Sequence, residues 1–166
     1  MGDLGKPDAS LLMRTLLNFP EFLRAIGRTA TRVTETSNLP TRLYQLACMR
    51  TVWLCDSEYL WARHRVECLE IGITDEELYE VAIGPKSTKL EGLDKLIVEA
   101  IDEMHNMHYL TDEQWSGFDQ FGHNAVMDLM TTYGFYTTMA ATVNTMGVPL
   151  DEGFSGYSDE LKALKA

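Results

Sequence analysis

The chain has 166 residues, of which 45% are hydrophobic and 23% charged, and these values exclude wholesale disorder and fit one domain with a real core. The net charge of −11 is concentrated between residues 67 and 119, and with no basic stripe it excludes a typical nucleic-acid-binding protein. No apolar run approaches about 20 residues and the start has no signal-peptide layout, so we expect neither a membrane span nor secretion. Three cysteines without paired spacing indicate a reducing, cytoplasmic setting.

The first half of the chain contains several residues that typically begin a helix. Ser10 precedes an apolar run that ends near residue 18, and Pro20 and Pro40 each begin a further predicted helix, the second over residues 41–54. Ser57 is a candidate N-cap for a helix that runs to residue 70. Four-residue sequences that begin at Thr74 and Thr111 then fit the capping box, in which side chains satisfy the free amides of a helix start.

Two longer stripes of apolar residues complete the predicted fold. One runs over residues 93–108 with helical spacing, and the other covers residues 124–146 and ends at Gly147, a candidate C-cap. No segment alternates β-branched residues in the manner of a strand. We therefore predict a single all-α domain over residues 1–150, followed by a loose C-terminal tail over residues 151–166.

The predicted helix to residue 70 carries the most informative side chains. At 100° per residue, one face presents Ser57, Leu60, His64 and Cys68, with Trp61 at its edge. A histidine in such a stripe is commonly a packed core residue with one hydrogen bond. It is also the side chain best suited to give and take a proton near neutral pH, so spacing leaves both interpretations open.

The order and spacing of several short motifs resemble the carboxymuconolactone decarboxylase family, which includes the alkylhydroperoxidase D (AhpD) branch. The resemblance extends over about residues 39–153 and includes Ala47-Cys-Met-Arg50, Ser57-Glu-Tyr-Leu-Trp-Ala-Arg-His64, Gly72-Ile-Thr-Asp-Glu-Glu77 and Asn144-Thr-Met-Gly147. It implies an AhpD-like helical domain that assembles as a trimer-based homo-oligomer. The nine methionines and three tryptophans of a short helical chain fit the same expectation, because they exceed what one core comfortably holds.

The residues that differ from the family pattern bear on the chemistry. Peroxidase members carry a Cys-x-x-Cys, a histidine four residues after the second cysteine, and an upstream glutamate. Counted back from His64, these positions hold Ser57, Leu60 and Gln45. Serine and leucine form no thiolate or disulfide, and an amide does not take up a proton as a carboxylate does. A thiol-dependent hydroperoxide reductase is therefore disfavoured.

The resemblance then points to the cysteine-free branch, whose decarboxylase chemistry requires no metal or organic cofactor. It implies a lyase or isomerase that decarboxylates, rearranges or cyclises a small, enolisable, anionic substrate. His64 is the candidate general acid or base and Glu58 its partner, while Arg63 and Arg65 are candidate anion clamps. Further candidate substrate-binding residues are Gln45, Tyr59, Trp61 and Tyr136. Many branch members carry another histidine where this chain has Arg63.

Two alternatives remain at this level. His105 and His108, with Asp102, have ligand-like spacing on one helix, but the second Glu-x-x-His of a di-iron site is missing, so we expect no metal. A family relative without catalysis, acting as a binding or assembly subunit, is the other possibility. A pocket with a histidine of perturbed pKa beside Arg63 favours the enzyme, whereas a site filled by apolar side chains favours the subunit.

Overall fold

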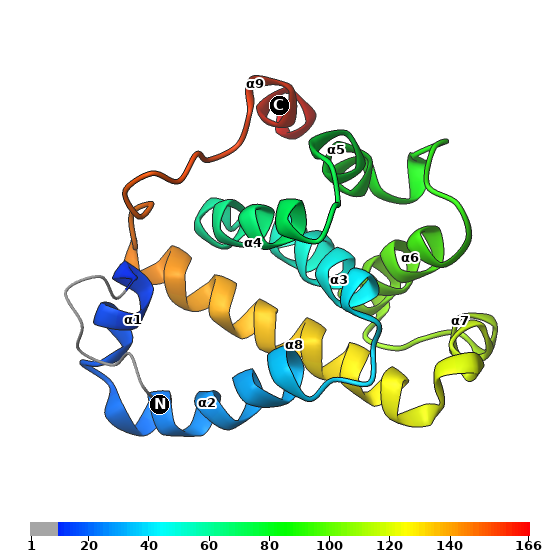
Figure 1. The fold of residues 1–166 in the computed structure, drawn as a ribbon, viewed down its shortest axis with the longest axis horizontal. Coiled ribbons are helices and arrows are strands. Elements are labelled where there is room, and N and C mark those ends of the chain that lie inside the picture. Colours follow the sequence, from blue (N-terminus) through cyan, green and yellow to red (C-terminus); the bar gives the residue numbers. More distant parts are fainter. Residues whose placement is uncertain (1–9) are drawn as a thin grey trace.

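The computed structural model describes residues 10–166, and within that range it contains helices and no strand, which confirms the all-α class (Figure 1). None of these helices is long and apolar enough to span a membrane. The helices are α1 (Leu11–Leu16), α2 (Pro20–Glu35), α3 (Thr41–Leu54), α4 (Glu58–Glu70), α5 (Asp75–Ile83), α6 (Gly92–Met107), α7 (Asp112–Gly117), α8 (His123–Met146) and α9 (Asp159–Lys165), with short 3₁₀ turns at Gly84–Lys86 and Asp119–Phe121.

The expected helix ends are where the capping residues place them. The side chains of Ser10, Thr74 and Thr111 each accept a hydrogen bond from a backbone amide of the following turn, and both capping boxes are complete. Gly147 ends α8 in the left-handed conformation, with φ 61°. One detail was wrong: His108 is exposed and ends α6 with φ 64°, so it does not extend the apolar stripe of that helix.

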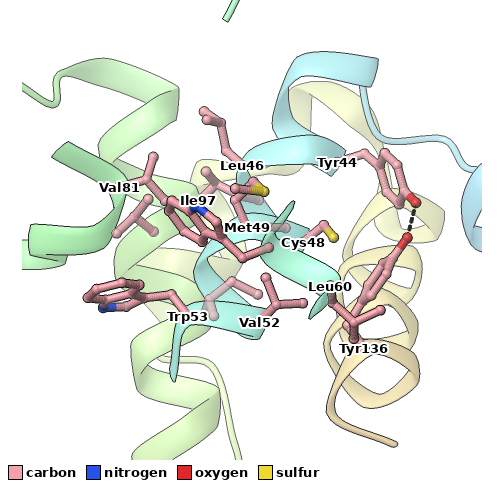
Figure 2. Packing of buried hydrophobic residues seen from close by; sticks show 14 of the residues in the cluster. Tyr44, Leu46, Cys48, Met49, Val52, Trp53, Leu60, Val81, Ile97 and Tyr136 are labelled. Carbon is pink, nitrogen blue, oxygen red and sulfur yellow. Dashed lines mark hydrogen bonds between the residues drawn. The ribbon is translucent and has the colours of Figure 1, made fainter. Parts of the chain in front are cut away.

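Helix α3 lies at the centre of the molecule and contacts α4, α5, α6 and α8. Every residue from Leu43 to Trp53 is buried, so this helix has no solvent face. A helix buried on all sides has neighbours all round, and Figure 2 shows Leu46, Met49 and Val52 of α3 packed among side chains of the surrounding helices. The position of α3 therefore decides where its few polar side chains lie.

One of those polar side chains is the buried guanidinium of Arg50. Its Nε and Nη2 atoms donate to the Asp102 carboxylate of α6 at 2.5 and 2.7 Å, and Nη1 donates to the carbonyls of Val81 and Ala82 at 2.9 and 2.7 Å. The backbone of Gly84 packs directly against the guanidinium of Arg50. Its φ is +79°, and a Cβ atom at this position would lie 2.2 Å from Nη2, so only glycine fits there. Arg50 therefore joins α3 to α6 and to the last turn of α5.

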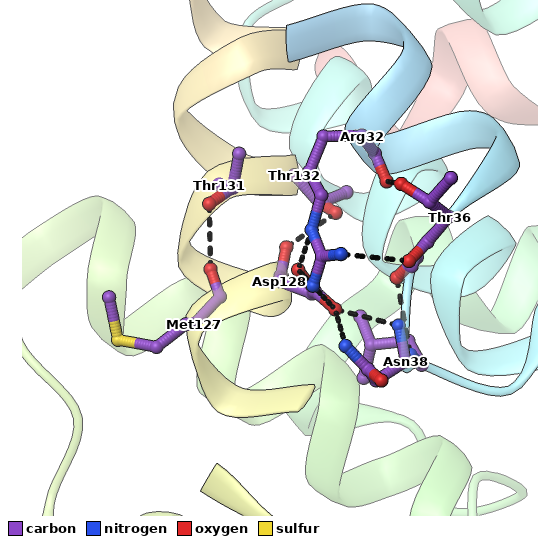
Figure 3. A network of polar contacts seen from close by, with 9 residues as sticks. Arg32, Thr36, Asn38, Met127, Asp128, Thr131 and Thr132 are labelled. Atoms are coloured by element: carbon purple, nitrogen blue, oxygen red, sulfur yellow. Dashed lines mark hydrogen bonds and ion pairs between the residues drawn. The ribbon is translucent and has the colours of Figure 1, made fainter. Parts of the chain in front are cut away.

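A second ion pair, between an exposed arginine and a buried carboxylate, joins α2 to α8. The Asp128 carboxylate accepts hydrogen bonds from Nε and Nη2 of Arg32, both at 2.8 Å, and from the backbone amide and side-chain Nδ2 of Asn38 at 2.6 and 2.7 Å (Figure 3). Each oxygen of this buried carboxylate is thus hydrogen-bonded, which offsets the cost of removing its charge from water.

The C-terminal segment differs from the loose tail that the sequence predicted. Tyr157 and Leu161 are buried, and the segment ends in α9, which packs beside α5 (Figure 1). The ammonium of Lys165 lies 2.8 Å from the Asp56 carboxylate, at the turn between α3 and α4. The sequence signal was weak because α9 has only seven residues and buries one leucine, too little for a visible helical stripe.

We predict that Asp102→Ala destabilises the protein by about 3–5 kcal/mol, because it leaves the buried Arg50 guanidinium without its carboxylate. Urea unfolding followed by circular dichroism measures the change. The matched control is Glu103→Ala at the next position of α6, which has no ion pair among residues 10–166 and should cost less than about 0.5 kcal/mol. Equal effects of the two substitutions would contradict the role given to Arg50.

Candidate functional site

A group of polar side chains interrupts the apolar core between α3, α4 and α8. Figure 2 shows three of them, Tyr44 and Cys48 from α3 and Tyr136 from α8. Helix α4 adds an imidazole, a carboxylate and a thiol, and α3 adds an amide. We call this group the polar cluster; it consists of Tyr44, Gln45, Cys48, His64, Glu67, Cys68 and Tyr136.

His64 belongs to the polar cluster, and only 8% of its surface is exposed to solvent. Its Nδ1 atom is 3.2 Å from Oε2 of Glu67, one turn later in α4, within ion-pair distance but not aligned for a hydrogen bond. The imidazole meets the Tyr136 ring edge to face, with centroids 4.8 Å apart and planes at 89°. The Gln45 side chain donates from Nε2 to the same Glu67 oxygen at 3.0 Å.

The Glu67 carboxylate is half exposed and is held ionised by its neighbours. Partial burial raises its pKa, but contact with His64 and the hydrogen bond from Gln45 outweigh that effect and lower the pKa to about 2. Glu67 is therefore a carboxylate at neutral pH. It lies beside the imidazole of His64, the type of side chain best suited to carry a proton near neutral pH.

Two phenols form the wall of the cluster opposite α4. The hydroxyls of Tyr44 and Tyr136 are hydrogen-bonded to each other, and both side chains are buried (Figure 2). Burial raises the pKa of each, so both stay neutral at physiological pH. Since one hydroxyl proton joins the pair, the other remains available to a further acceptor.

The thiols in and near the cluster are poor nucleophiles. Cys48 and Cys68 are fully buried, and burial raises the pKa of both, that of Cys68 to about 12 with help from the neighbouring Glu67 charge. Burial also raises the pKa of Cys55. The thiolate is the reactive form, and these environments suppress it.

Two of the predicted polar residues serve other contacts. Glu58 accepts a hydrogen bond through Oε1 from the backbone amide of Tyr157 at 2.8 Å, so it holds the C-terminal segment. Arg65 forms a bidentate pair with Asp75 at the start of α5, at 2.6 and 2.5 Å. Within residues 10–166, neither side chain forms a hydrogen bond or ion pair with His64.

The other predicted residues on α4 bind the segment that follows α8. The Tyr59 hydroxyl donates to Oδ2 of Asp151 at 2.7 Å, and Nη1 of Arg63 lies 3.2 Å from the same oxygen. Trp61 packs against Trp53, with ring centroids 5.4 Å apart. Arg63 still lies near enough to Glu67 for its charge to lower the pKa of that carboxylate.

The structure therefore brings together three of the predicted site residues, Gln45, His64 and Tyr136, and adds others that sequence reasoning missed. Glu67 is three residues after His64, and side chains at this spacing meet on a helix, so that signal was present. Tyr44 had no comparable signal, because it meets Tyr136 across 92 residues of chain.

No group of three or more histidine, cysteine or acidic side chains gathers for a metal ion in residues 10–166. His105 packs edge to face against Tyr133, with centroids 6.4 Å apart, while His108 is exposed at the end of α6. The ligand-like spacing of these two histidines does not produce a shared site.

We predict that stability falls as the pH is lowered from about 4.5 to about 2, because the Glu67 carboxylate, whose pKa is lowered in the folded state, takes up a proton in that range. Since this side chain is half exposed, solvent screening limits its contribution to about 1 kcal/mol. Glu67→Gln should flatten the loss by that amount in acid-dependent urea unfolding. The control Glu70→Gln, an exposed position on the same helix, should follow the wild type, and a Glu67→Gln curve parallel to the wild type would contradict the assignment.

Comparison with known proteins shows one similarity in sequence and one in fold. Residues 20–87, which contain α2 to α5, match the model of the carboxymuconolactone decarboxylase family, and no curated protein matches the chain. The fold is similar to the crystal structure of a protein of unknown function from Agrobacterium tumefaciens that was proposed to be the antioxidant defence protein AhpD. The TM-score is 0.70 at 13% identity, over 82% of this chain and 95% of that one, so the likeness is one of fold. The predicted resemblance is thereby confirmed: residues 20–87 match the model of the carboxymuconolactone decarboxylase family, and the fold is AhpD-like.

Proposed function

We propose that the protein is a cofactor-free acid–base enzyme, a lyase or isomerase, that acts on a small enolisable substrate at the polar cluster. The observation that carries the proposal is the juxtaposition of His64 with the ionised Glu67 and the neutral pair of Tyr44 and Tyr136. Helix α4 supplies the proton carrier and its counter-charge, and the phenols supply a hydrogen-bond donor. The match of residues 20–87 to the carboxymuconolactone decarboxylase family supports the same class of chemistry.

The proposed decarboxylation is balanced by these groups alone. The bond between the carboxylate and the adjacent carbon breaks, CO₂ leaves, and the bonding electrons form an enolate. The protonated imidazole of His64 then delivers its proton to the enolate carbon, and the Glu67 carboxylate stabilises the imidazolium beforehand. A phenol proton from Tyr44 or Tyr136 binds the enolate oxygen, where negative charge develops. In an isomerisation, His64 removes a proton from one carbon and returns it to another.

Arg63 is the cation that would bind an anionic substrate. It lies near Glu67 and is paired with Asp151 at 3.2 Å. That arginine is about one-third exposed, so a substrate carboxylate competes with Asp151 for it. Arg65 is already neutralised by a bidentate pair and is the weaker candidate. The proposal therefore retains Arg63 as the anion contact and replaces Glu58 with Glu67 as the partner of His64.

A trimer-based homo-oligomer remains part of the proposal. Val66 and Leu69 on the outer face of α4, and Ile71 just after it, keep about 40% of their surface exposed (40%, 39% and 44%). Apolar side chains gathered at one end of a helix fit an intersubunit contact. Light scattering at micromolar concentration distinguishes an oligomer from a monomer.

We predict that His64→Gln lowers turnover about 10²–10⁴-fold, the usual contribution of positioned proton transfer, while the fold is retained. The assay is a panel of lactone carboxylates and β-keto acids in deuterated water, with CO₂ release and deuterium incorporation at the enolisable carbon followed by nuclear magnetic resonance (NMR). The matched control is His105→Gln, a histidine outside the cluster that packs on a tyrosine, and it should retain wild-type turnover. Wild-type turnover by His64→Gln, or no turnover of any panel member by the wild type, counts against the enzyme and favours a non-catalytic family relative.

We also predict negligible thiol-dependent hydroperoxide turnover, although the structural relative was proposed to be an antioxidant protein. Ser57 and Leu60 occupy the redox-cysteine positions, and the thiols of Cys48 and Cys68 are buried with raised pKa values. Peroxide consumption coupled to a dithiol reductant provides the measurement. Turnover that disappears in Cys48→Ser or Cys68→Ser would show that a buried thiol becomes reactive.

A further inference from the structure

The Glu67 carboxylate of the polar cluster has one hydrogen-bond partner within residues 10–166, the side-chain amide of Gln45. Nε2 of that amide donates to Oε2 of Glu67 at 3.0 Å, and the same oxygen lies 3.2 Å from Nδ1 of His64. The Glu67 side chain keeps 46% of its surface exposed, so packing alone does not prevent it from turning towards solvent. The hydrogen bond from Gln45 is therefore what holds this oxygen beside the imidazole.

The Gln45 side chain is itself fixed in place and in orientation. It belongs to α3, which has no solvent face, and it is buried. Its Oε1 atom accepts a weak hydrogen bond from Sγ of Cys68 at 3.8 Å, while Nε2 faces the ionised Glu67. The reversed amide would place Oε1 against the carboxylate, where two acceptors repel each other. Gln45 is thus preorganised as a hydrogen-bond donor to Glu67.

The two ring nitrogens of His64 have different surroundings. Nδ1 is shielded from solvent, and the acceptor nearest to it among the described residues is Oε2 of Glu67 at 3.2 Å. A lone pair on Nδ1 would be repelled by that charged oxygen, whereas an N–H group there is attracted to it. In neutral histidine a proton on Nδ1 leaves Nε2 as the base, and the contacts of the ring within residues 10–166 include no hydrogen bond to Nε2.

We propose that Gln45 is a positioning residue that acts through Glu67. It fixes the carboxylate beside Nδ1 of His64, so the neutral imidazole carries its proton on Nδ1 and keeps Nε2 as the nitrogen that reacts. The partner of one ring nitrogen sets the tautomer of a histidine, and here that partner is held from a second helix. The effect of Gln45 on turnover rests on the proposed function of His64, whereas its effect on the tautomer does not.

The first test measures the tautomer directly at the ring nitrogens. In protein made with histidine labelled at its ring nitrogens, a long-range nitrogen–proton correlation spectrum at about pH 9, above the usual titration range of histidine, separates protonated from bare nitrogens. The chain has four histidines, and His64→Gln assigns the signals of His64. We expect wild-type His64 to carry its proton on Nδ1, and the exposed His108 to show the Nε2–H form that histidine favours in water.

Three variants separate positioning from packing. Gln45→Met nearly keeps the side-chain volume and removes the amide, and Gln45→Asn keeps an amide that is one methylene too short to reach Glu67. Both should shift His64 towards the Nε2–H form, and so should Glu67→Gln, which removes the charge beside Nδ1.

The matched control is Leu46→Met, at the next buried position of α3, which alters packing but not the amide and should keep the proton on Nδ1. Circular dichroism verifies that each variant is folded. A wild-type His64 in the Nε2–H form, Gln45 variants that keep the proton on Nδ1, or an unaltered tautomer in Glu67→Gln overturns the proposal.

Turnover of the panel member that the wild type accepts gives a second measurement. Gln45→Met should lower kcat about 10–100-fold, a usual loss for a misplaced catalytic group, with KM little changed. Because Gln45 acts through Glu67, adding Gln45→Met to Glu67→Gln should cause no further loss, whereas a general structural role multiplies the two losses and overturns the proposal. If the wild type turns over no panel member, the proposed function fails, and the tautomer measurement still decides the role of Gln45.

Discussion

The buried guanidinium of Arg50 is the interaction on which the arrangement of this protein depends. It satisfies the carboxylate of Asp102 and two carbonyls at the end of α5 at once, so α3 has one position in which that charge is fully paired. A shift of α3 by one turn would leave a charge in the core without partners. Because Gln45 and Cys48 belong to the same helix, this constraint also places the α3 side of the polar cluster. The stability of the core and the geometry of the site thus have one physical origin.

Helix α4 then serves two separate environments. Residues 61 and 64 are about 60° apart around the helix axis, which is enough to place Trp61 at a cavity between α4, α5 and the segment before α9, and the His64 imidazole among polar groups of α3 and α8. The polar cluster contains an ionised carboxylate beside an imidazole, and the cavity has paired cations and a surplus of negative charge. One helix therefore positions two environments of different polarity and charge.

The features that sequence predicted well are those with local causes. The capping residues at 10, 74 and 111 act within one helical turn, so their patterns located helix starts directly. His64 and Gln45 were found because they occupy positions of a recognisable motif. Sequence reasoning paired His64 with Glu58, but in the structure the carboxylate beside the imidazole is that of Glu67. Glu58 accepts a hydrogen bond from the amide of Tyr157, 99 residues away, a contact that no local spacing reveals. Short amphipathic elements such as α9 and pairs such as Tyr44 with Tyr136 become visible only when the chain is folded.

The central claim is that the imidazole of His64 itself transfers the proton, and chemical rescue tests it most directly. His64→Gly removes the ring and leaves a space of imidazole size bordered by Glu67 and Tyr136. On the substrate that the wild type turns over, this variant should be inactive alone and should regain activity saturably with added imidazole, because the freed carboxylate and phenol remain to bind and orient the exogenous ring. Activity in His64→Gly that is unchanged by imidazole, whether high or absent, would contradict proton transfer by this side chain.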